Sequence, residues 1–297
     1  MARDGNPVVA LDTATSVNDA RHMLTAAFQA AECASPEIDA RFLLQGVLGL
    51  SAADLMRAPD RTLGDASAVL SACAQRRLTG EPVSRILGQR GFYGRTFVIT
   101  PDVLDPRPET ETLVEAALEI VTTNGWRDRP ITIADVGTGS GILMVTLLAE
   151  LPLATGIASD ISAAALAVAQ INAERLGVGG RVRFVAAPGL GHLGGYAQLI
   201  VSNPPYIPAS EIAGLARDVR DFDPVLALDG GPDGLGVYRD FANDFMKFGN
   251  KTPIALEIGA GQAAGVDAIF AEAGAQMTGQ KADLSGHIRV VIFEPRC

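Results

Sequence analysis

The chain has 297 residues, 24 Lys and Arg against 34 Asp and Glu, and a formal net charge of −10. Hydrophobic residues make up 48% and charged residues 20%, which excludes wholesale disorder and allows a sizeable buried core. The negative charge argues against a non-specific nucleic-acid binder, because such a protein neutralises phosphates with a basic surface. No apolar stretch reaches the roughly 18 residues that a membrane-spanning helix needs, so no membrane association is expected.

The N-terminus and the cysteines favour a reducing compartment. Residues 1–7 lack the charged and then apolar pattern of a secretory signal. Cys33, Cys73 and Cys297 are far apart and odd in number, so neither a disulfide framework nor a CxxC metal clip is expected. The histidines are equally scattered, and no metal site is predicted. We therefore expect a cytoplasmic protein.

Residues 1–80 are predicted to form a small helical bundle. Ser16 and Asp19 resemble a capping pair, and Ser35-Pro36-Glu37 is typical of a helix start, with Gly49 near the stop. Two further helices are expected, one opened by Ser51 and Asp54 and one over residues 65–78. One face of the second helix is expected to carry Ile38, Phe42, Leu43, Val47 and Leu48.

Residues 81–106 are predicted to be a hairpin or linker, with β-like runs at 84–87 and 96–100. Residues 107–297 are predicted to form one further domain. After a helix over 112–122, strands alternate with helices, which indicates an α/β fold with a parallel, doubly wound sheet covered on both faces. The expected strands are 131–136, 155–160, 181–185, 199–202, 253–258 and 288–293, and the expected helices are 141–150, 162–176 and 262–273.

A glycine-rich loop lies between the first of these strands and the following helix. It reads Asp135-Val136-Gly137-Thr138-Gly139-Ser140-Gly141, and its glycines allow a sharp turn and close approach to a ligand. Asp160 ends the next strand, where a carboxylate can accept hydrogen bonds from ribose hydroxyls. The alternative, a purely structural turn, is disfavoured because strand, helix and acid are all present.

The spacing of the glycines distinguishes a dinucleotide ligand from a nucleoside ligand without a pyrophosphate. A dinucleotide fingerprint has the spacing GxGxxG, whereas here it is GxGxG, and no basic residue follows to hold phosphate. Asp135 would also repel a pyrophosphate. It favours instead a ligand that carries an ammonium or sulfonium group.

A second loop, Asn203-Pro204-Pro205-Tyr206, follows the apolar strand 199–202. The prolines fix φ, remove two N–H donors and hold the preceding residues extended. The loop is therefore stiff, and its carbonyls lack local partners. A simple strand terminator is the alternative interpretation.

Such a loop addresses the low nucleophilicity of a planar NH₂ group, whose lone pair is delocalised. If the Asn203 Oδ1 and the Pro204 carbonyl each accept one of its hydrogens, the nitrogen is aimed at an electrophile. Tyr206 could stack on the planar group or face positive charge.

With these motifs, the chain resembles class I S-adenosylmethionine-dependent methyltransferases, and more closely the HemK/PrmC protein-glutamine N5-methyltransferases, which modify the Gly-Gly-Gln glutamine of peptide chain release factors. The similarity covers nearly the whole chain. Its N-terminal and linker matches are Ser35-Pro36, Asp39-Ala40, Gly49-Leu50, Arg76-Arg77, Gly80-Glu81-Pro82, Leu87-Gly88, Phe92-Tyr93-Gly94 and Pro106 to Glu111. Beyond the two loops, further matches are Asp233-Gly234-Leu235, Tyr238-Arg239, Glu257-Ile258-Gly259 and Asp283 to Gly286.

The resemblance implies a Rossmann-like, mostly parallel seven-stranded sheet and a set of residue roles. Residues 137–141 (Gly137, Thr138, Gly139, Ser140 and Gly141) would hold the methionine part of S-adenosyl-L-methionine, and Asp160 its ribose. Asn203 would contact both cofactor and substrate amide. Pro204, Pro205 and Tyr206 would shape the glutamine pocket, bordered by Arg107 and Glu109. The helical bundle would help to hold a class 1 release factor, the product would be S-adenosyl-L-homocysteine, and a monomer is expected.

The chain departs from this family after strand 181–185. Relatives usually carry an acid and a large residue there, near the adenine, but here the stretch reads Val185-Ala186-Ala187-Pro188-Gly189. The loss of one hydrogen bond to the adenine would weaken cofactor binding by about 1 kcal/mol. A loss of this size would not abolish binding.

Three alternatives stay open. The substrate could be the glutamine of a ribosomal protein, or DNA adenine, although the net charge and the lack of a basic recognition domain disfavour DNA. The chain could also be a non-catalytic module that keeps the cofactor fold as a scaffold.

Overall fold

The computed structural model describes residues 9–193, 195–245 and 252–296. Residues 1–7, tested above for a signal pattern, and Cys297 lie outside this range. The chain divides into a smaller unit, residues 1–89 with 217–222, and a larger unit, residues 90–216 with 223–297. Within the described residues, no helix combines the length and apolar character needed to cross a membrane.

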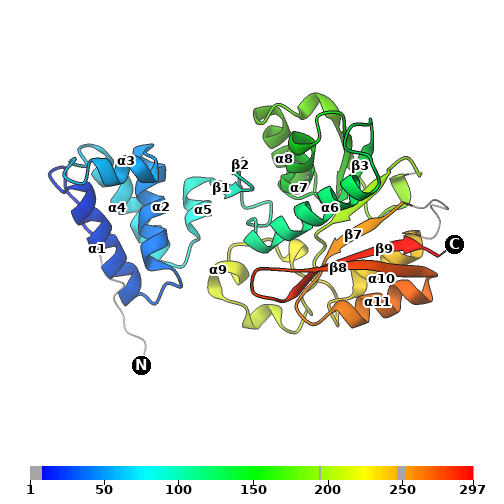
Figure 1. The fold of residues 1–297 in the computed structure, drawn as a ribbon. Coiled ribbons are helices and arrows are strands. Elements are labelled where there is room, and N and C mark those ends of the chain that lie inside the picture. The colour runs from blue at the N-terminus through cyan, green and yellow to red at the C-terminus, as the bar shows by residue number, and fades with distance from the viewer. Residues whose placement is uncertain (1–8, 194, 246–251, 297) are drawn as a thin grey trace. The chain divides into compact units, whose positions relative to one another are not determined.

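The smaller unit is helical (Figure 1, blue to cyan). Its first four helices begin where the capping residues predict: Ser16 accepts a hydrogen bond from the Asp19 N–H, and Ser51 with Asp54 forms a capping box. Gly49 ends the second helix with a φ of 64°. The helices are α1 (Val17–Ala30), α2 (Pro36–Leu48), α3 (Ala52–Arg57), α4 (Ala66–Leu78), α5 (Val83–Leu87) and α9 (Arg217–Arg220).

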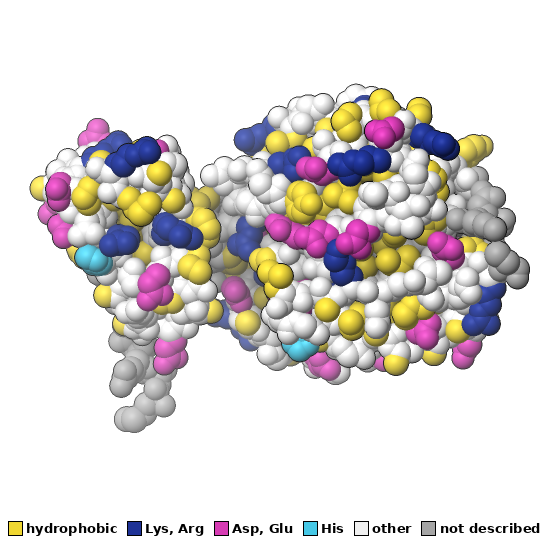
Figure 2. All heavy atoms as spheres, viewed as in Figure 1, with side chains coloured by type: hydrophobic (Ala, Val, Ile, Leu, Met, Phe, Trp, Pro, Cys, Tyr) yellow, Lys and Arg dark blue, Asp and Glu magenta, His cyan; other side chains and the backbone are white. Residues whose placement is uncertain are grey.

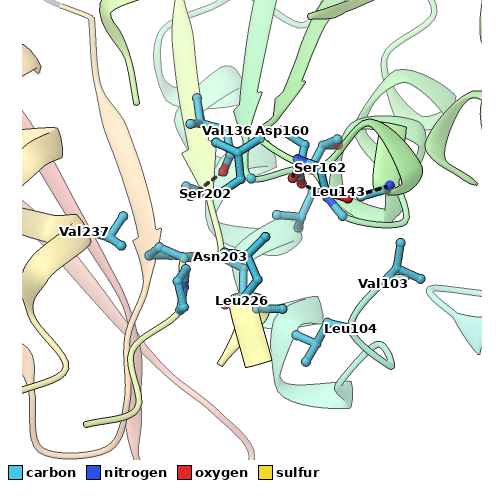
Figure 3. A pocket seen from close by; sticks show the side chains of 18 of the residues that line it. Val103, Leu104, Val136, Leu143, Asp160, Ser162, Ser202, Asn203, Leu226 and Val237 are labelled. Atoms are coloured by element: carbon cyan, nitrogen blue, oxygen red, sulfur yellow. Dashed lines mark hydrogen bonds between the residues drawn. The ribbon is translucent and has the colours of Figure 1, made fainter. Parts of the chain in front are cut away.

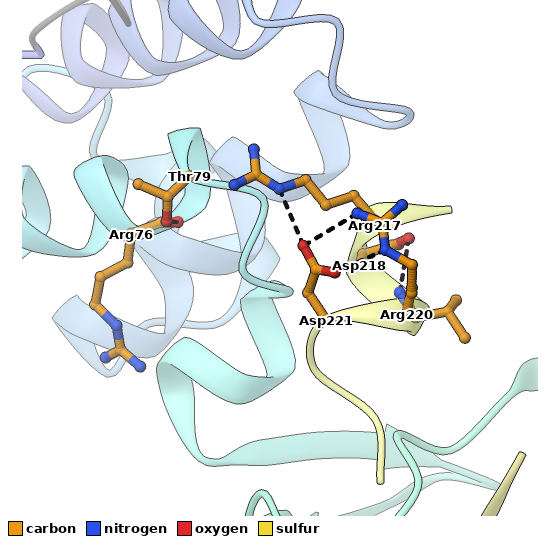
Figure 4. Close-up of polar contacts among 7 residues, drawn as sticks. Arg76, Thr79, Arg217, Asp218, Arg220 and Asp221 are labelled. Atoms are coloured by element: carbon orange, nitrogen blue, oxygen red, sulfur yellow. Dashed lines mark hydrogen bonds and ion pairs between the residues drawn. The ribbon is translucent and has the colours of Figure 1, made fainter. Parts of the chain in front are cut away.

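Two expectations for this unit need correction, and one of its features was not foreseen. Residues 84–87 are not β-like but belong to α5, which starts after Pro82 and ends at Gly88 in the left-handed conformation. On α2, Ile38 and Phe42 are 47% and 45% exposed, because the helix turns Leu43 and Leu44 into the core instead. Finally, residues 217–222 join this unit from far along the chain; Figure 4 shows their exposed ion pairs between Asp221 and both Arg217 and Arg220.

The larger unit contains a hairpin, β1 (Gln89–Phe92) with β2 (Arg95–Val98), and a seven-stranded sheet in the order β5-β4-β3-β6-β7-β9-β8. The first five strands are parallel, and β9 runs antiparallel to both of its neighbours, β7 and β8, which confirms the predicted fold class of a mostly parallel sheet. The strands are β3 (Thr132–Val136), β4 (Thr155–Asp160), β5 (Val182–Ala186), β6 (Leu199–Ser202), β7 (Ile254–Glu257), β8 (Ala275–Ala282) and β9 (Ile288–Pro295).

Helices cover both faces of this sheet (Figure 1). α6 (Glu111–Thr123), α7 (Ile142–Glu150) and α8 (Ala163–Arg175) pack on one face, and α10 (Gly236–Phe245) and α11 (Ala263–Glu272) pack on the other. Phe270 of α11 stacks on Phe293 of β9 with ring centroids 4.2 Å apart. Figure 2 shows acidic side chains gathered along the face that carries α6, where Lys281 of β8 pairs with Glu115 and Glu119.

The order of the strands creates a crevice at one edge of the sheet. β3 pairs with β4 on one side and with β6 on the other, so the chain reverses its direction of winding at β3. In open α/β sheets, ligands bind outside the carboxyl ends of the strands at such a point. Two short 3₁₀ turns, Pro108–Thr110 and Val225–Ala227, lie in the connections that follow β2 and β6.

Asn172 connects the hairpin to the glycine loop. This buried α8 side chain is 1% exposed; it accepts a hydrogen bond from the Val98 N–H and donates to the Val98 and Ser140 carbonyls. We expect Asn172→Ala to lower the free energy of unfolding by about 3 kcal/mol, because buried polar partners lose their hydrogen bonds. Urea unfolding would measure this, with the exposed Gln170→Ala on the same helix as control. Equal losses in both variants would contradict the assignment.

Candidate active site

A cavity of about 710 Å³ opens in the larger unit at the carboxyl ends of β3, β4 and β6. This volume falls in the range of small-molecule sites. Figure 3 shows Asp160 and Ser162 on one side of it, Asn203 in the middle and the apolar Leu104 and Leu226 at its other end. Its walls come from residues 101–104, 106, 107, 110, 136–140, 142, 143, 160–162, 165, 187–189, 202–205, 224, 226 and 227, and from α10.

Residues 137–140 of the glycine loop line the cavity, whereas its last glycine does not. Gly137 and Gly139 have φ values of 73° and 54°, and a Cβ at either position would meet no protein atom within 4 Å. The space beside them is therefore open for a ligand. Gly141 does not line the cavity: its φ is 81°, and a Cβ there would lie 3.0 Å from the Ala169 Cβ, so it serves helix packing.

Asp135 lies beneath this loop, fully buried, with one oxygen engaged. Its Oδ2 accepts hydrogen bonds from the Thr138 hydroxyl at 2.6 Å and from the Met144 N–H at 3.2 Å, whereas its Oδ1 has no partner among the described residues. Burial raises the pKa of Asp135 to about 7, and these hydrogen bonds only partly offset it. An unpaired buried carboxylate oxygen favours a cationic neighbour.

Asp160 stands at the end of β4 on the cavity wall. Its Oδ2 accepts from the Gly139 N–H and its Oδ1 from the Ser162 N–H, both at 2.9 Å. These bonds fix the carboxylate and tie it to the glycine loop. Each oxygen keeps a further lone pair for a ligand hydroxyl.

Asn203 follows β6 at the centre of the cavity. Because β3 and β6 pair in parallel, with Asp135 opposite Val201, the glycine loop and the Asn203 loop emerge side by side. The Ser202 hydroxyl donates to the Val136 carbonyl at 2.5 Å and joins the two strand ends (Figure 3). The Asn203 Nδ2 donates to the Thr110 Oγ1 at 3.2 Å, which leaves its Oδ1 as an available acceptor.

The rest of the Asn-Pro-Pro-Tyr loop divides between cavity and core. Pro204 and Pro205 line the cavity, and none of the described residues donates a hydrogen bond to the Pro204 carbonyl. The Tyr206 side chain is not part of the lining; it packs against the core on the α10 side, where a Cβ on Gly259 would meet its ring at 3.2 Å. Burial raises the pKa of Tyr206 to about 12, so its hydroxyl stays protonated.

Arg107 and Glu109 also occupy different places. Arg107 lines the cavity, while Glu109 is exposed and outside its lining. The Arg107 Nη2 lies 2.6 Å from the Asp223 Oδ2, and the Asp105 N–H donates to the Asp223 Oδ1. Asp223 is not a solvated loop charge: its side chain is 1% exposed, and a carboxylate so buried requires such partners.

Residues 187–189, in the stretch that departs from the family, line the cavity beside the acidic residues of α10. Ala187, Pro188 and Gly189 line the cavity together with Asp240, Asn243 and Asp244 of α10. The Asp244 Oδ2 accepts a hydrogen bond from the Leu190 N–H at 3.3 Å, and a Cβ on Gly189 would lie 3.0 Å from the same oxygen. Carboxylates therefore reach this wall from another element, although the stretch itself has none.

Sequence reasoning missed two further residues, Thr110 and Glu257. Both lie in stretches that match the family, but neither has a recognisable motif role. Their signal is polarity at a position where burial is expected: Glu257 ends an apolar strand and is 1% exposed, and Thr110 is fully buried. Only the pairing of β6 with β7, which places Ser202 opposite Leu256, brings Glu257 next to Asn203.

Comparisons with known proteins agree with this geometry. The family model described as "PrmC N-terminal domain" matches residues 19–88, and the model described as "Methyltransferase small domain" matches residues 115–217. Among solved structures, the hMettl16 catalytic domain in complex with MAT2A 3'UTR hairpin 6 is 14% identical, with a TM-score of 0.55 over 78% of this chain and 82% of that one. At this identity the likeness shows the fold alone, so fold and family model together define a methyltransferase.

Curated relatives narrow the family further. The "Release factor glutamine methyltransferase" of Bradyrhizobium diazoefficiens is 42% identical over 282 residues, 94% of this chain and 95% of the relative. Its counterpart in Rhodospirillum rubrum is 43% identical over 263 residues, 88% of this chain and 79% of that one. The chain belongs to the family of release factor glutamine methyltransferases.

The raised pKa of Asp135 predicts a pH-dependent stability. Protonated Asp135 favours the folded state, so its contribution is complete below the unfolded pKa near 3.8 and is lost as the pH rises through about 7. Asp135→Asn cannot ionise, so its free energy of unfolding should fall less than that of the wild type between about pH 5 and pH 8. Urea titrations at both pH values would check this. An unchanged slope in the variant would show that Asp135 is not the titrating group.

Proposed function

We propose that this protein transfers a methyl group from S-adenosyl-L-methionine to the side-chain amide nitrogen, N5, of the glutamine in the Gly-Gly-Gln motif of class 1 peptide chain release factors. The observation that carries the proposal is Asn203, which lines the cavity with its NH₂ group bonded to Thr110 and its oxygen available. The names of relatives about 40% identical over most of the chain support this substrate.

The residues around the glycine loop fit S-adenosyl-L-methionine. Open space lies beside Gly137 and Gly139, and the unpaired Oδ1 of Asp135 favours a cationic ligand nearby. Thr138 and Ser140 would help to hold the methionine part, and Asp160 would accept hydrogen bonds from ribose hydroxyls. When bound, S-adenosyl-L-methionine supplies an electrophilic methyl group on its sulfonium and leaves as S-adenosyl-L-homocysteine.

The Asn203 loop would position the substrate amide. The Asn203 Oδ1 and the Pro204 carbonyl would each accept one hydrogen of the flat carboxamide, so that its nitrogen is held in line with the methyl group. These acceptors also stabilise the positive charge that develops on the nitrogen during transfer. No strong base is required beforehand, because the proton leaves a nitrogen that is already cationic.

The remaining parts of the protein would recognise the partner. Arg107 and Glu109 would border the glutamine pocket, Pro205 would shape it, and Tyr206 would support it from the core. The N-terminal bundle, residues 1–80, would contact the release factor. The partner is a protein rather than nucleic acid or membrane, and we propose that a monomer acts on it in the cytoplasm, where translation ends.

Mass spectrometry of a release factor after incubation with enzyme and cofactor would test this function. The expected result is one added methyl group on the Gly-Gly-Gln peptide. Parallel incubations with ribosomes and with DNA test the two other acceptors, a ribosomal-protein glutamine and DNA adenine. Methylation of either in place of the release factor would overturn the proposed substrate. Cofactor binding without transfer to any of the three would favour a non-catalytic module.

Asn203→Ala should remove turnover and spare cofactor binding. We expect kcat to fall about 100-fold or more, because the variant loses an oriented group that acts on the reacting amide. The affinity for S-adenosyl-L-methionine, measured by calorimetry, should fall only about fivefold. Asn124→Ala, at the exposed end of α6, is the control and should retain full activity. A variant at position 203 with wild-type turnover would contradict the role of the asparagine.

We also propose that α10 supplies the carboxylate that the stretch after β5 lacks. Asp244 is the group in contact with this stretch, through the Leu190 N–H. Asp244→Asn keeps an oxygen for that N–H but loses the charge, so the dissociation constant of S-adenosyl-L-methionine should rise about fivefold while kcat at saturation is unchanged. Asp267→Asn on α11 is the control. Equal affinities for Asp244→Asn and wild type would show that the adenine is held without this carboxylate.

A further inference from the structure

A buried glutamate lies directly behind Asn203, outside the cavity lining. Glu257 ends β7, and it is 1% exposed. β6 and β7 are parallel, and Ser202 pairs with Leu256. The residues that follow this pair, Asn203 and Glu257, therefore lie next to each other at the same edge of the sheet. A carboxylate at this depth is unfavourable unless hydrogen bonds hold it, so its presence requires a physical reason.

Glu257 is hydrogen bonded to the two side chains that set the geometry of the site. Hydrogen bonds from the side chains of Thr110 and Asn203 lower the pKa of its carboxyl group, whereas its Oε2 has no hydrogen-bond partner among the described residues. An ionised carboxylate only accepts, so Thr110 presents its hydroxyl hydrogen and Asn203 presents its NH₂ group. The Asn203 Nδ2 also donates to the Thr110 Oγ1 at 3.2 Å. Both N–H hydrogens of Asn203 are then engaged away from the substrate.

We propose that Glu257 is a positioning residue that acts through Thr110 and Asn203 and keeps the Asn203 amide turned with its oxygen toward the substrate. The inference rests on the proposed function. Without the carboxylate, the amide could turn by half a rotation and present its NH₂ group to the NH₂ group of the glutamine. Two donors would then face each other, and the substrate nitrogen would not be held.

The surroundings of Glu257 leave this role sensitive to protonation. Burial raises the pKa of Glu257 to about 7; the nearby Glu109 carboxylate raises it further, and Thr110, Arg289 and Asn203 lower it. Tyr206 and Tyr238 are its other titratable neighbours, both with a pKa raised by burial, and the Tyr238 hydroxyl donates to the Glu257 carbonyl. Near neutral pH, therefore, Glu257 is the group in this cluster whose pKa is raised into range, and its protonation weakens the carboxyl group as an acceptor for Asn203 and Thr110.

Glu257→Gln tests the proposal, because glutamine keeps the shape and adds a donor. With a release factor as substrate, we expect kcat at pH 8 to fall about tenfold or more, with the affinity for S-adenosyl-L-methionine within about twofold of wild type. Because the variant has no buried charge, it should be at least as stable as wild type to urea at that pH. A merely structural role predicts the reverse, with lower stability and unchanged kcat.

The pH profile of kcat provides a second readout. In the wild type, kcat should rise with pH through about 7, and this rise should be absent in Glu257→Gln. Thr110→Val, which removes the hydroxyl between the two side chains at nearly constant volume, should also lower kcat. Glu272→Gln, an exposed position on α11, is the control.

Two results would overturn the inference. One is wild-type kcat in Glu257→Gln, and the other is an unchanged pH profile in that variant. Failure of the proposed function is distinct, because the wild type itself would then methylate no release factor.

Discussion

The parallel pairing of β3 with β6 is the constraint on which the site depends. It brings together two loops separated by more than 60 residues, Gly137 to Gly141 and Asn203 to Tyr206, at one edge of the sheet. The Ser202 hydroxyl on the Val136 carbonyl fixes that junction. Because parallel strands end at a common edge and the chain winds away from β3 in both directions, a cavity forms there without any special insertion. The chemistry of the two loops then decides what the cavity can do.

Buried polar groups surround this cavity, and each restricts the orientation of a side chain that faces it. Asp135 lies under the glycine loop, Asp223 behind Arg107, and Glu257 behind Asn203. Buried carboxylates destabilise a fold unless they are paired, so their concentration around one cavity indicates a functional requirement rather than a structural one. Asp135 and Glu257 both have a pKa raised to about 7 by burial. When ionised, these buried groups lower the stability of the fold, but they place negative charge at fixed positions near the proposed methyl transfer.

The sequence predicted those parts of the fold that local patterns encode. Strand–helix alternation gave the sheet, and β4 and β6 have the expected bounds because each has a clear end: β4 ends at Asp160, and the apolar β6 ends before Asn203-Pro204. β8 was missed because Ala275 to Ala282 is poor in β-branched residues and is held in place by β9. In the site, Gly137 and Gly139 belong to one short motif and Asp160 ends the next strand, and all three line the cavity. Asp223, Thr110 and Glu257 come from distant segments, and only tertiary pairing reveals their roles.

The central claim concerns the direction of one amide group: the oxygen of Asn203, and not its nitrogen, faces the substrate carboxamide. A crystal structure with S-adenosyl-L-homocysteine and a peptide containing Gly-Gly-Gln tests it most directly. The predicted result is the glutamine N5 within hydrogen-bond distance of both the Asn203 Oδ1 and the Pro204 carbonyl, and directed at the sulfur of the cofactor product. A glutamine bound elsewhere in the cavity, or an Asn203 side chain turned away from it, would contradict the claim.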